Sequence, residues 1–327
     1  MTELAEAAFL AGSTEPQPAR ARGDRFAAFA RAFDEPSFLA SLREQRVRWL
    51  ARSDREFPHA LRAIFDPPPG LFLRGSGEAE VLDRPAVAIV GARACSSYGA
   101  HVARMLGREL ALAGLLVVSG LARGIDAEAH RGALEGGGVT VAVLGCGIDR
   151  DYPAAHRELA RRVAEHGLVV SEYPPGVEPA PWRFPARNRI IAGLSAGTVV
   201  VEARERSGAL ITADLALEEG REVFAVPGEI TSALSAGTNT LLRVGATPVR
   251  GAPDVLESFG LAPPEATPAA PDGTAGKILA LLREAAASPD ELVRVTGLTP
   301  SMLGAALTEL ELAGAVIEGE GVYRAAL

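Results

Sequence analysis

Short apolar runs alternate with amphipathic stretches through the middle of the chain. The runs are rich in valine, alanine and leucine, and helical patterns separate most of them. Such alternation is typical of parallel strands joined by crossover helices. Because the runs are apolar at consecutive positions, we expect helices on both faces of the sheet. The predicted strands are 71–73, 86–90, 115–119, 139–144, 168–171, 198–202 and 222–226, and the predicted helices are 100–113, 127–135, 155–165 and 210–219.

The two ends of the chain have a different pattern. The sequence pattern predicts an N-terminal segment without regular structure for residues 1–25 and short helices for residues 26–61. Near the other end, Ser288 to Glu291 form a capping-box motif, Leu303, Leu307 and Leu310 line one helix face, and a hairpin pattern follows. Helices followed by a hairpin indicate a winged helix. We expect an N-terminal helical region (1–60), an α/β domain with a mainly parallel sheet and helices on both faces (61–260), a linker rich in proline, alanine and glycine (261–276) and a winged-helix domain (277–327).

Composition limits the classes of function. The 327 residues carry a formal net charge of −8, so a general nucleic-acid-coating protein is not expected, although a local basic groove is allowed. The cysteines, Cys95 and Cys146, are far apart, which disfavours a disulfide framework or a zinc site and indicates a reducing cytoplasm. The acidic N-terminus does not resemble a signal peptide, and no apolar run is long enough for a membrane span.

Arginines gather where the predicted strands end. In an open parallel sheet, the carboxyl ends of the strands form the ligand-binding edge, and helix N-termini at that edge add amide donors for phosphate. An acidic protein that collects arginines there has the chemistry of an anion site, although surface arginines are common in loops. The arginines in these loops are Arg93, Arg123, Arg150, Arg183, Arg187, Arg189, Arg204 and Arg206.

The common phosphate cofactors do not fit this edge. A dinucleotide site needs G-x-G-x-x-G after the first strand and an acidic residue at the end of the second, but the second strand ends in Ser119 and Gly120. The chain also lacks the G-x-x-x-x-G-K-[ST] motif of ATP-binding loops. We therefore expect no cofactor.

No catalytic constellation emerges from the sequence. Asp126 and His130 are four residues apart, as metal ligands can be, but no third ligand is evident, so a helix cap and a packed or surface histidine are the favoured interpretation. Cys95 and Cys146 are candidate nucleophiles without a suggestive histidine partner, and packing is favoured for both. We expect Glu202, at the end of a buried strand, to pair with a nearby arginine. An enzyme acting on a nucleotide or nucleoside phosphate remains the alternative function.

Aromatic and basic residues are interleaved in the segment "APWRFPARNRII". Trp182 and Phe184 alternate with Arg183, Arg187 and Arg189. Aromatic faces and guanidinium planes stack bases and hold the backbone of single-stranded nucleic acid. The alternative is that both rings anchor a long loop by packing.

Several long motifs resemble one family. The segments "VAIVGARACSSYG", "VVSGLARGIDAEAHRGAL", "FPARNRIIAGLS" and "RSGALITADLALEEGREVFAVPG" lie in a stretch from about Phe57 to Gly251 that is similar to the DNA-processing protein A (DprA/Smf) family. The resemblance implies an extended Rossmann fold that binds single-stranded DNA, protects incoming strands in natural transformation and promotes loading of a RecA-type recombinase. It also implies a homodimer without enzyme activity, with single-strand-binding protein as a further candidate partner.

The resemblance also implies where DNA binds. The family's Gly-Ser/Thr-Arg phosphate motif corresponds to Gly91, Ala92 and Arg93, so one hydroxyl contact is absent here. A lysine common near the aromatic residue of the "FPARN" segment is also absent, and we expect Arg183 or Arg187 to take its place. The predicted DNA-binding residues are Gly91, Ala92, Arg93, Ser96, Gly120, Arg123, Gly124, Arg183, Phe184, Arg187, Asn188, Arg189, Ser207 and Gly208.

The predicted winged helix does not have the charge of a DNA-binding module. Residues 277–327 contain four basic and seven acidic residues, a net charge of −3. The expected recognition helix carries Glu309 and Glu311 and no basic residue. Phosphates should be repelled by this surface, so we expect it to contact protein or to self-associate.

Overall fold

The computed structural model describes residues 2–13, 23–262, 273–312, 314–319 and 321–325. The chain divides into two compact units, residues 1–263 and residues 264–327. Within the described ranges, no helix combines the length and the apolar character needed to cross a membrane.

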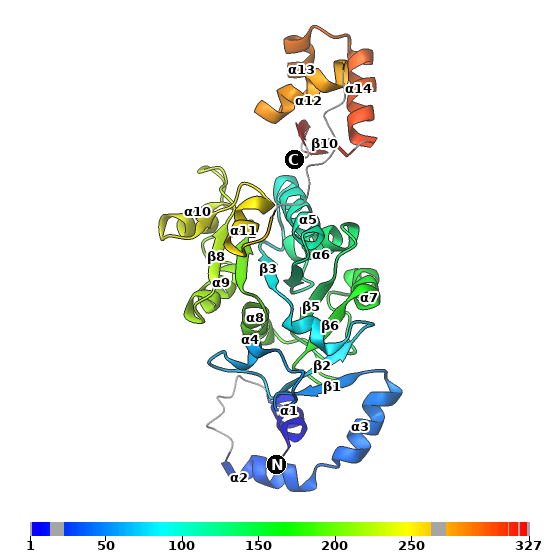
Figure 1. The fold of residues 1–327 in the computed structure, drawn as a ribbon, viewed down its shortest axis with the longest axis vertical. Helices are drawn as coiled ribbons and strands as arrows, with labels where there is room; N and C mark the ends of the chain where they lie inside the picture. Colours follow the sequence, from blue (N-terminus) through cyan, green and yellow to red (C-terminus); the bar gives the residue numbers. More distant parts are fainter. Residues whose placement is uncertain (1, 14–22, 263–272, 313, 320, 326–327) are drawn as a thin grey trace. The chain divides into compact units, whose positions relative to one another are not determined.

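A nine-stranded sheet forms the centre of the first unit (Figure 1). Its order is β1-β2-β6-β5-β4-β3-β7-β8-β9, and neighbouring strands from β6 to β9 are parallel. β2 runs antiparallel to β1 and β6. Since the other neighbouring strands are parallel, the predicted mainly parallel sheet is confirmed. The strands are β1 (Arg48–Ala51), β2 (Gly70–Arg74), β3 (Ala86–Val90), β4 (Leu116–Ser119), β5 (Thr140–Leu144), β6 (Leu168–Ser171), β7 (Gly197–Val200), β8 (Glu222–Ala225) and β9 (Thr247–Pro248).

The winding direction of the sheet reverses beside β3. The chain proceeds from β3 through β4 and β5 to β6, and then returns to place β7 on the other side of β3. A crevice forms at the carboxyl ends of the strands where the winding reverses, because the two adjacent loops lead to helices on opposite faces. The loops after β3 and β7 therefore flank the expected ligand site.

Helices cover both faces of the sheet, as the apolar runs predict. Ala88 and Val90 of β3 belong to one buried cluster, which includes residues of α8 and α9. Val87 and Ile89 belong to another, with residues of α5, α6 and α11. The helices after β3 are α5 (Ser97–Leu112), α6 (Ile125–Glu135), α7 (Arg157–His166), α8 (Arg183–Leu194), α9 (Gly208–Glu218), α10 (Ala236–Arg243) and α11 (Ala252–Ser258). Two short 3₁₀ helices, η2 (Ala79–Asp83) and η3 (Ala154–His156), lie before β3 and before α7.

The N-terminal region differs from the expectation. Residues 3–11, predicted to lack regular structure, form α1 (Glu3–Ala11), and the Thr2 hydroxyl caps it by accepting a hydrogen bond from the Ala5 amide at 3.3 Å. Leu4 and Ala7 are buried in the cluster that contains Leu42 and Phe72, and this tertiary packing explains a helix without a strong local signal. Residues 14–22 of this predicted segment lie outside the described residues. The predicted short helices of 26–61 are present as α2 (Gly23–Ala32), α3 (Glu35–Glu44) and α4 (His59–Arg62).

The segment around Phe184 is a helix and not a long loop. It forms α8, and its second half buries Ile190, Ile191 and Leu194 against the sheet. A helix directs its side chains around an axis, so neighbouring arginines of this segment must point to different surroundings. The expectation that Arg183, Arg187 and Arg189 lie in a loop is therefore wrong.

The second unit has the elements of the predicted winged helix. Its helices α12 (Thr274–Glu284), α13 (Pro289–Thr296) and α14 (Pro300–Leu312) precede strands β10 (Val316–Gly319) and β11 (Val322–Ala325). The capping box is confirmed, because the Ser288 side chain accepts from the Glu291 amide while the Glu291 carboxylate accepts from Ser288. The helical part begins at Thr274, so the predicted linker ending at 276 is slightly too long, and most of that linker lies outside the described residues.

Candidate nucleic-acid interface

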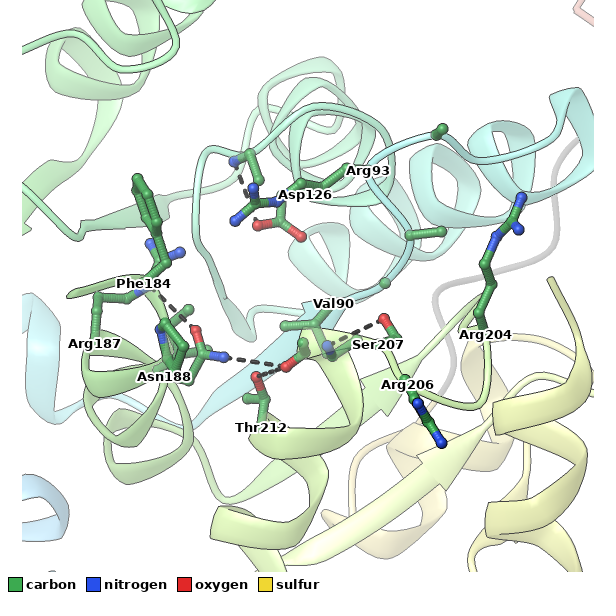
Figure 2. Close-up of a pocket in the computed structure, with 18 of the residues that line it drawn as sticks. Val90, Arg93, Asp126, Phe184, Arg187, Asn188, Arg204, Arg206, Ser207 and Thr212 are labelled. Carbon is green, nitrogen blue, oxygen red and sulfur yellow. Dashed lines mark hydrogen bonds between the residues drawn. The ribbon is translucent and has the colours of Figure 1, made fainter. Parts of the chain in front are cut away.

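A cavity of about 300 Å³ lies at the carboxyl ends of β3 and β7, where the winding of the sheet reverses. The loops after these strands, the start of α6, the first turns of α8 and the N-terminus of α9 contribute to its lining (Figure 2). Eight of the predicted DNA-binding residues therefore come together although they are distant in sequence. They are Gly91, Ala92, Arg93, Phe184, Arg187, Asn188, Ser207 and Gly208.

Three exposed arginines line the cavity without a carboxylate partner in the described ranges. They are Arg93 after β3, and Arg204 and Arg206 after β7. Figure 2 shows Arg204 and Arg206 on one side of the view and Phe184 and Asn188 on the other. Uncompensated guanidinium groups around a concavity are suited to an anionic ligand. Arg204 and Arg206 belong to the arginines singled out at the strand ends, but the predicted set of DNA-binding residues omits both.

Arg187 is part of the wall of the cavity. Only 4% of it is exposed, and its Nη1 donates to the carbonyl oxygens of Gly120, at 2.9 Å, and Val143. Burial lowers the pKa of the guanidinium to about 10, and the nearby Asp126 carboxylate opposes this shift. A side chain at position 120 would overlap the guanidinium, so Gly120 makes room for Arg187. The main role of Arg187 in this geometry is to tie the ends of β4 and β5 to α8.

Asp126 brings a carboxylate into the lining. It is buried, and its Oδ2 accepts a hydrogen bond from the Ala122 amide at 3.3 Å. Burial raises the pKa of this carboxyl, while Arg187 and Arg93 act in the opposite direction. Asp126 therefore partly compensates the arginines at the inner end of the cavity, and the exposed rim retains the stronger positive character.

The ring of Phe184 lies among groups that can stack. The Arg93 guanidinium is 5.2 Å from the ring centroid, and the ring of Tyr152 is stacked on Phe184 with a centroid distance of 5.4 Å and an interplanar angle of 24°. Phe184 is partly exposed, and Tyr152 is 44% exposed. The result is a small aromatic and guanidinium platform beside the cavity, to which a flat base could be added.

The N-terminus of α9 faces the cavity. Ser207 is its N-cap and accepts from the Ala209 amide at 3.3 Å. The position that a Cβ of Gly208 would take is open space, so the backbone is accessible there. The side chain of Asn188 donates to the Gly208 carbonyl at 3.1 Å and holds α8 against this turn. Amide groups at a helix N-terminus, with Arg204 and Arg206 beside them, form a site suited to phosphate.

Other predicted site residues have structural partners and do not line the cavity. Arg183 is buried, donates to carbonyl oxygens of Ala11 and Glu178 and lies over the ring of Tyr173. Arg189 forms two 2.8 Å contacts with the carboxylate of Glu172. Burial lowers the pKa of Arg189, but the charge and hydrogen bonds of Glu172 raise it more, so the guanidinium remains charged. The geometry therefore gives no support to a role in DNA binding for either arginine.

Arg123 and Gly124 occupy the loop that leads into α6, beside the cavity lining. Arg123 is exposed and forms no ion pair in the described part of the chain. Gly124 caps α6 with φ of 74°, and a Cβ there would overlap the carbonyl oxygen of Ala92. Glycine is required at 124 by both the positive φ and the close approach.

The expectation that Glu202 pairs with an arginine is wrong. Its carboxylate accepts hydrogen bonds from the Ser96 amide at 3.0 Å and the Ser96 hydroxyl at 2.6 Å. Ser96 also caps α5, so this predicted DNA-binding residue is engaged within the protein. The sequence offered no signal for this pair, because 106 positions separate the two residues.

The residues considered for catalysis have structural surroundings. Burial raises the pKa of Cys146 to about 11 and also raises the pKa of Cys95, so neither thiol is activated as a nucleophile. His130 is fully buried, and its Nδ1 lies 2.7 Å from the Thr140 hydroxyl. Asp126 accepts from a backbone amide, so it does not share a ligand position with His130. In the described ranges, no group of three potential ligands could hold a metal ion.

Two family models match consecutive parts of the chain. The DNA recombination-mediator protein A family matches residues 48–260, and the DprA winged helix domain matches residues 262–321. DNA processing protein DprA of Bacillus subtilis is 41% identical over 224 residues, which cover 68% of this chain and 75% of the relative. DNA processing protein DprA of Streptococcus pneumoniae is 48% identical over 203 residues, which cover 62% of this chain and 71% of the relative.

Solved structures give the same result. The X-ray structure of DprA from Streptococcus pneumoniae matches with a TM-score of 0.66 and 41% identity, over 78% of this chain and 86% of that one. A structure of DNA processing protein A from Helicobacter pylori, described for its single-stranded DNA binding mode, matches with a TM-score of 0.59 and 31% identity, over 65% of this chain and 95% of that one. The resemblance seen in the sequence is confirmed, and the chain belongs to the DNA recombination-mediator protein A family, known as DprA or Smf.

Proposed function

We propose that this chain binds single-stranded DNA in the cavity between β3 and β7 and acts in DNA recombination. The observation that carries the proposal is the juxtaposition of three exposed arginines without carboxylate partners, Arg93, Arg204 and Arg206, with a partly exposed aromatic ring, Phe184, around one concavity. Backbone phosphates need the positive charge, and unstacked bases need the flat ring.

The cavity offers different contacts to the two parts of a nucleotide. A phosphate meets the N-terminus of α9 at Ser207 and Gly208, with Arg204 and Arg206 beside it. A base stacks on the platform formed by Phe184 and Tyr152. Because each nucleotide supplies both groups, a strand can use the two contacts together, whereas a duplex has its bases already paired and stacked.

Membership of the family extends the proposal to a biological role. The relatives are named DNA processing proteins, and the Helicobacter pylori relative is described by its single-stranded DNA binding mode. On that basis the chain protects incoming single strands in natural transformation and promotes loading of a RecA-type recombinase, as a homodimer without enzyme activity of its own. Single-strand-binding protein is a further candidate partner.

Fluorescence anisotropy tests the proposal directly. Labelled oligo-dT of increasing length, a duplex of equal length and free mononucleotides are titrated with the protein at several salt concentrations. We expect affinity for oligo-dT to increase with length and to fall with salt, because phosphate contacts release counterions. Preferential binding of duplex, or tight binding of a mononucleotide without dependence on length, would overturn the proposal. The second of these outcomes would favour the alternative enzyme acting on nucleotides.

A matched pair of variants assigns the binding to the cavity. The double variant Arg204→Ala with Arg206→Ala removes two charges without carboxylate partners from the rim. We expect the slope of log affinity against log salt concentration to decrease by the equivalent of about one to two phosphate contacts. Arg161→Ala removes an exposed arginine on α7 that is paired with Glu158 and Glu165, and should leave affinity and slope nearly unchanged. Equal effects of the two changes would mean that the strand binds by general attraction and not in the cavity.

A further inference from the structure

Glu202 fills the N-terminus of a helix that begins beside the cavity. It follows β7 and is 4% exposed. Both of its carboxylate oxygens accept hydrogen bonds from Ser96, the N-cap residue of α5, at 3.0 Å from the amide and 2.6 Å from the hydroxyl. A buried carboxylate at the positive end of a 16-residue helix is stabilised by the helix dipole and by charge-assisted hydrogen bonds.

This arrangement is a capping box completed from another part of the chain. In an ordinary capping box, the N-cap hydroxyl accepts from the third helical residue, and a glutamate at that third position reaches back to the N-cap amide. The Ser96 hydroxyl accepts from the amide of Gly99, which occupies the third position and has no side chain. A Cβ at position 99 would overlap the carboxylate of Glu202, so Glu202 stands where the missing side chain would be.

The second unit contains the ordinary form of the same motif. In α13, Ser288 and Glu291 are three residues apart, and the Ser288 amide donates to the Glu291 carboxylate at 2.8 Å. In α5 the carboxylate comes from the loop after β7 and so joins the two loops that flank the cavity. The main chain reinforces the link, because the Ala92 amide donates to the Glu202 carbonyl at 2.8 Å.

The location of this carboxylate has a consequence for ligand choice. In Rossmann-type folds, the first helix after the first strand presents its N-terminus to the phosphates of a nucleotide. Here Glu202 already takes the hydrogen bonds of the N-cap and brings a negative charge that repels phosphate. At the N-terminus of α9 the Ser207 hydroxyl accepts from the Ala209 amide, no carboxylate in the described residues accepts from its first amides, and a Cβ at Gly208 would meet open space.

We propose that Glu202 is a specificity-determining residue that acts as a built-in substitute for phosphate at the start of α5 and thereby excludes free phosphate and nucleotides from that site. Anionic ligands are left with the N-terminus of α9 and the exposed arginines. The inference rests on the proposed function for the identity of the ligand at the N-terminus of α9. The position of the Glu202 carboxylate at the N-terminus of α5 does not depend on that function.

Titration with inorganic phosphate tests the proposal in the full chain. The wild type, Glu202→Ala and Glu202→Gln are each saturated with oligo-dT to fill the cavity, and phosphate binding is then measured by calorimetry. We expect Glu202→Ala to bind phosphate about tenfold more tightly than the wild type, because the helix terminus becomes vacant. Glu202→Gln is the matched control: its amide fills the same volume and keeps the helix terminus occupied, so only a gain much smaller than that of Glu202→Ala is expected. A folded Glu202→Ala without a gain, or an equal gain in Glu202→Gln, would overturn the proposal.

Two further measurements keep the test decisive. If Glu202→Ala does not fold, the melting temperature of Glu202→Gln is compared with that of the wild type. We expect a loss of about 2–4 °C in the Gln variant, since the charge at the helix terminus is removed while the shape is kept. Identical melting temperatures would refute the inference. If oligo-dT does not bind the wild type, the proposed function fails, whereas the contrast between the Ala and Gln variants without DNA still decides this inference.

Discussion

The cavity rim and the winged-helix unit both have shapes that proteins use to bind nucleic acid, but their charges differ in sign. The rim exposes Arg93, Arg204 and Arg206 without carboxylate partners in the described ranges. Residues 277–327 contain four basic and seven acidic residues. On α14, Glu309 and Glu311 are exposed, and no basic residue is present.

The difference shows that shape alone does not indicate what a surface binds. A helix can enter the major groove of duplex DNA only if phosphates are attracted to its surroundings. The net charge of −8 conceals this division, because it averages an acidic module with a rim of exposed arginines. The proposal therefore places single-stranded DNA in the cavity, and we expect the winged-helix unit to contact protein.

The arginines of the cavity itself divide into those that build it and those that are available to a ligand. Arg187→Ala tests this division, and we expect its effect on the free energy of unfolding to be the largest among the variants. The change leaves the carbonyl groups of Gly120 and Val143 without their donor and removes the positive charge that most opposes the raised pKa of Asp126, so we expect a loss of about 3–5 kcal/mol in the free energy of unfolding. Chemical denaturation measures it, with Arg206→Ala as the exposed control. A small loss in Arg187→Ala would show that Arg187 is available to DNA.

Phe184→Ala tests the stacking platform. If the ring supports a base, its removal should weaken binding of single-stranded DNA by about 1–3 kcal/mol with little dependence on sequence. Anisotropy with oligo-dT and oligo-dC measures the loss, and Phe184→Trp should preserve most of the affinity because it retains a flat ring. A variant that loses thermal stability while its folded fraction binds normally would identify Phe184 as a packing residue.

The response to pH should also separate the two units. His130 lies in the first unit, its Nδ1 is bonded to Thr140, and its buried Nε2 has no hydrogen-bond partner in the described chain. Burial lowers its pKa to about 3, whereas the unfolded chain titrates near 6.5, so the unfolded state binds more protons below pH 6.5. The first unit should lose about 2 kcal/mol of stability between pH 7 and pH 5 from this residue.

The second unit contains no histidine and should lack this contribution. Thermal melts from pH 5 to pH 7 measure the difference, with the exposed His166→Gln as the control for His130→Gln. The His130 variant should show a flatter dependence on pH than the control. Equal slopes in the two variants would mean that His130 becomes protonated without opening the fold.

Arg93→Ala tests the exposed rim, with a smaller effect on affinity. Arg93 makes no ion pair in the described part of the chain, so its loss should leave the melting temperature nearly unchanged. We expect the affinity for single-stranded DNA to fall by about 1 kcal/mol and the slope of log affinity against log salt to decrease by about 0.7. Unchanged affinity and slope in the folded variant would remove Arg93 from the interface.

Truncation after Gly260 has the smallest expected effect on affinity for single-stranded DNA. It tests most directly whether the cavity or the winged-helix unit binds DNA. The first unit is a compact body of its own, so the shortened chain should fold and bind oligo-dT with nearly the affinity of the full chain. Anisotropy compares the two chains at physiological salt. A large loss on truncation, or duplex binding by residues 264–327 alone, would show that the acidic unit touches DNA.

The local pattern of the sequence was sufficient for the central strands and for most of the helices between them. Consecutive apolar residues in β3 to β8 and the amphipathic pattern between them predicted the strands and most of the helices after β3, because each depends on residues that are near one another in the chain. The capping box of α13 was predictable for the same reason. The collection of arginines at one edge followed from the general rule that parallel strands end together.

The partner of each side chain was decided by the tertiary structure. Arg187, Arg189 and Arg206 look alike in the sequence, yet one is bound to carbonyl groups, one to Glu172 and one faces solvent. The link between Glu202 and Ser96 and the burial of α1 also join segments that are distant in the chain. Sequence periodicity indicates which face of an element is buried. Hydrogen-bond partners depend instead on which backbone and carboxylate groups from distant parts of the sequence lie beside that face in the fold.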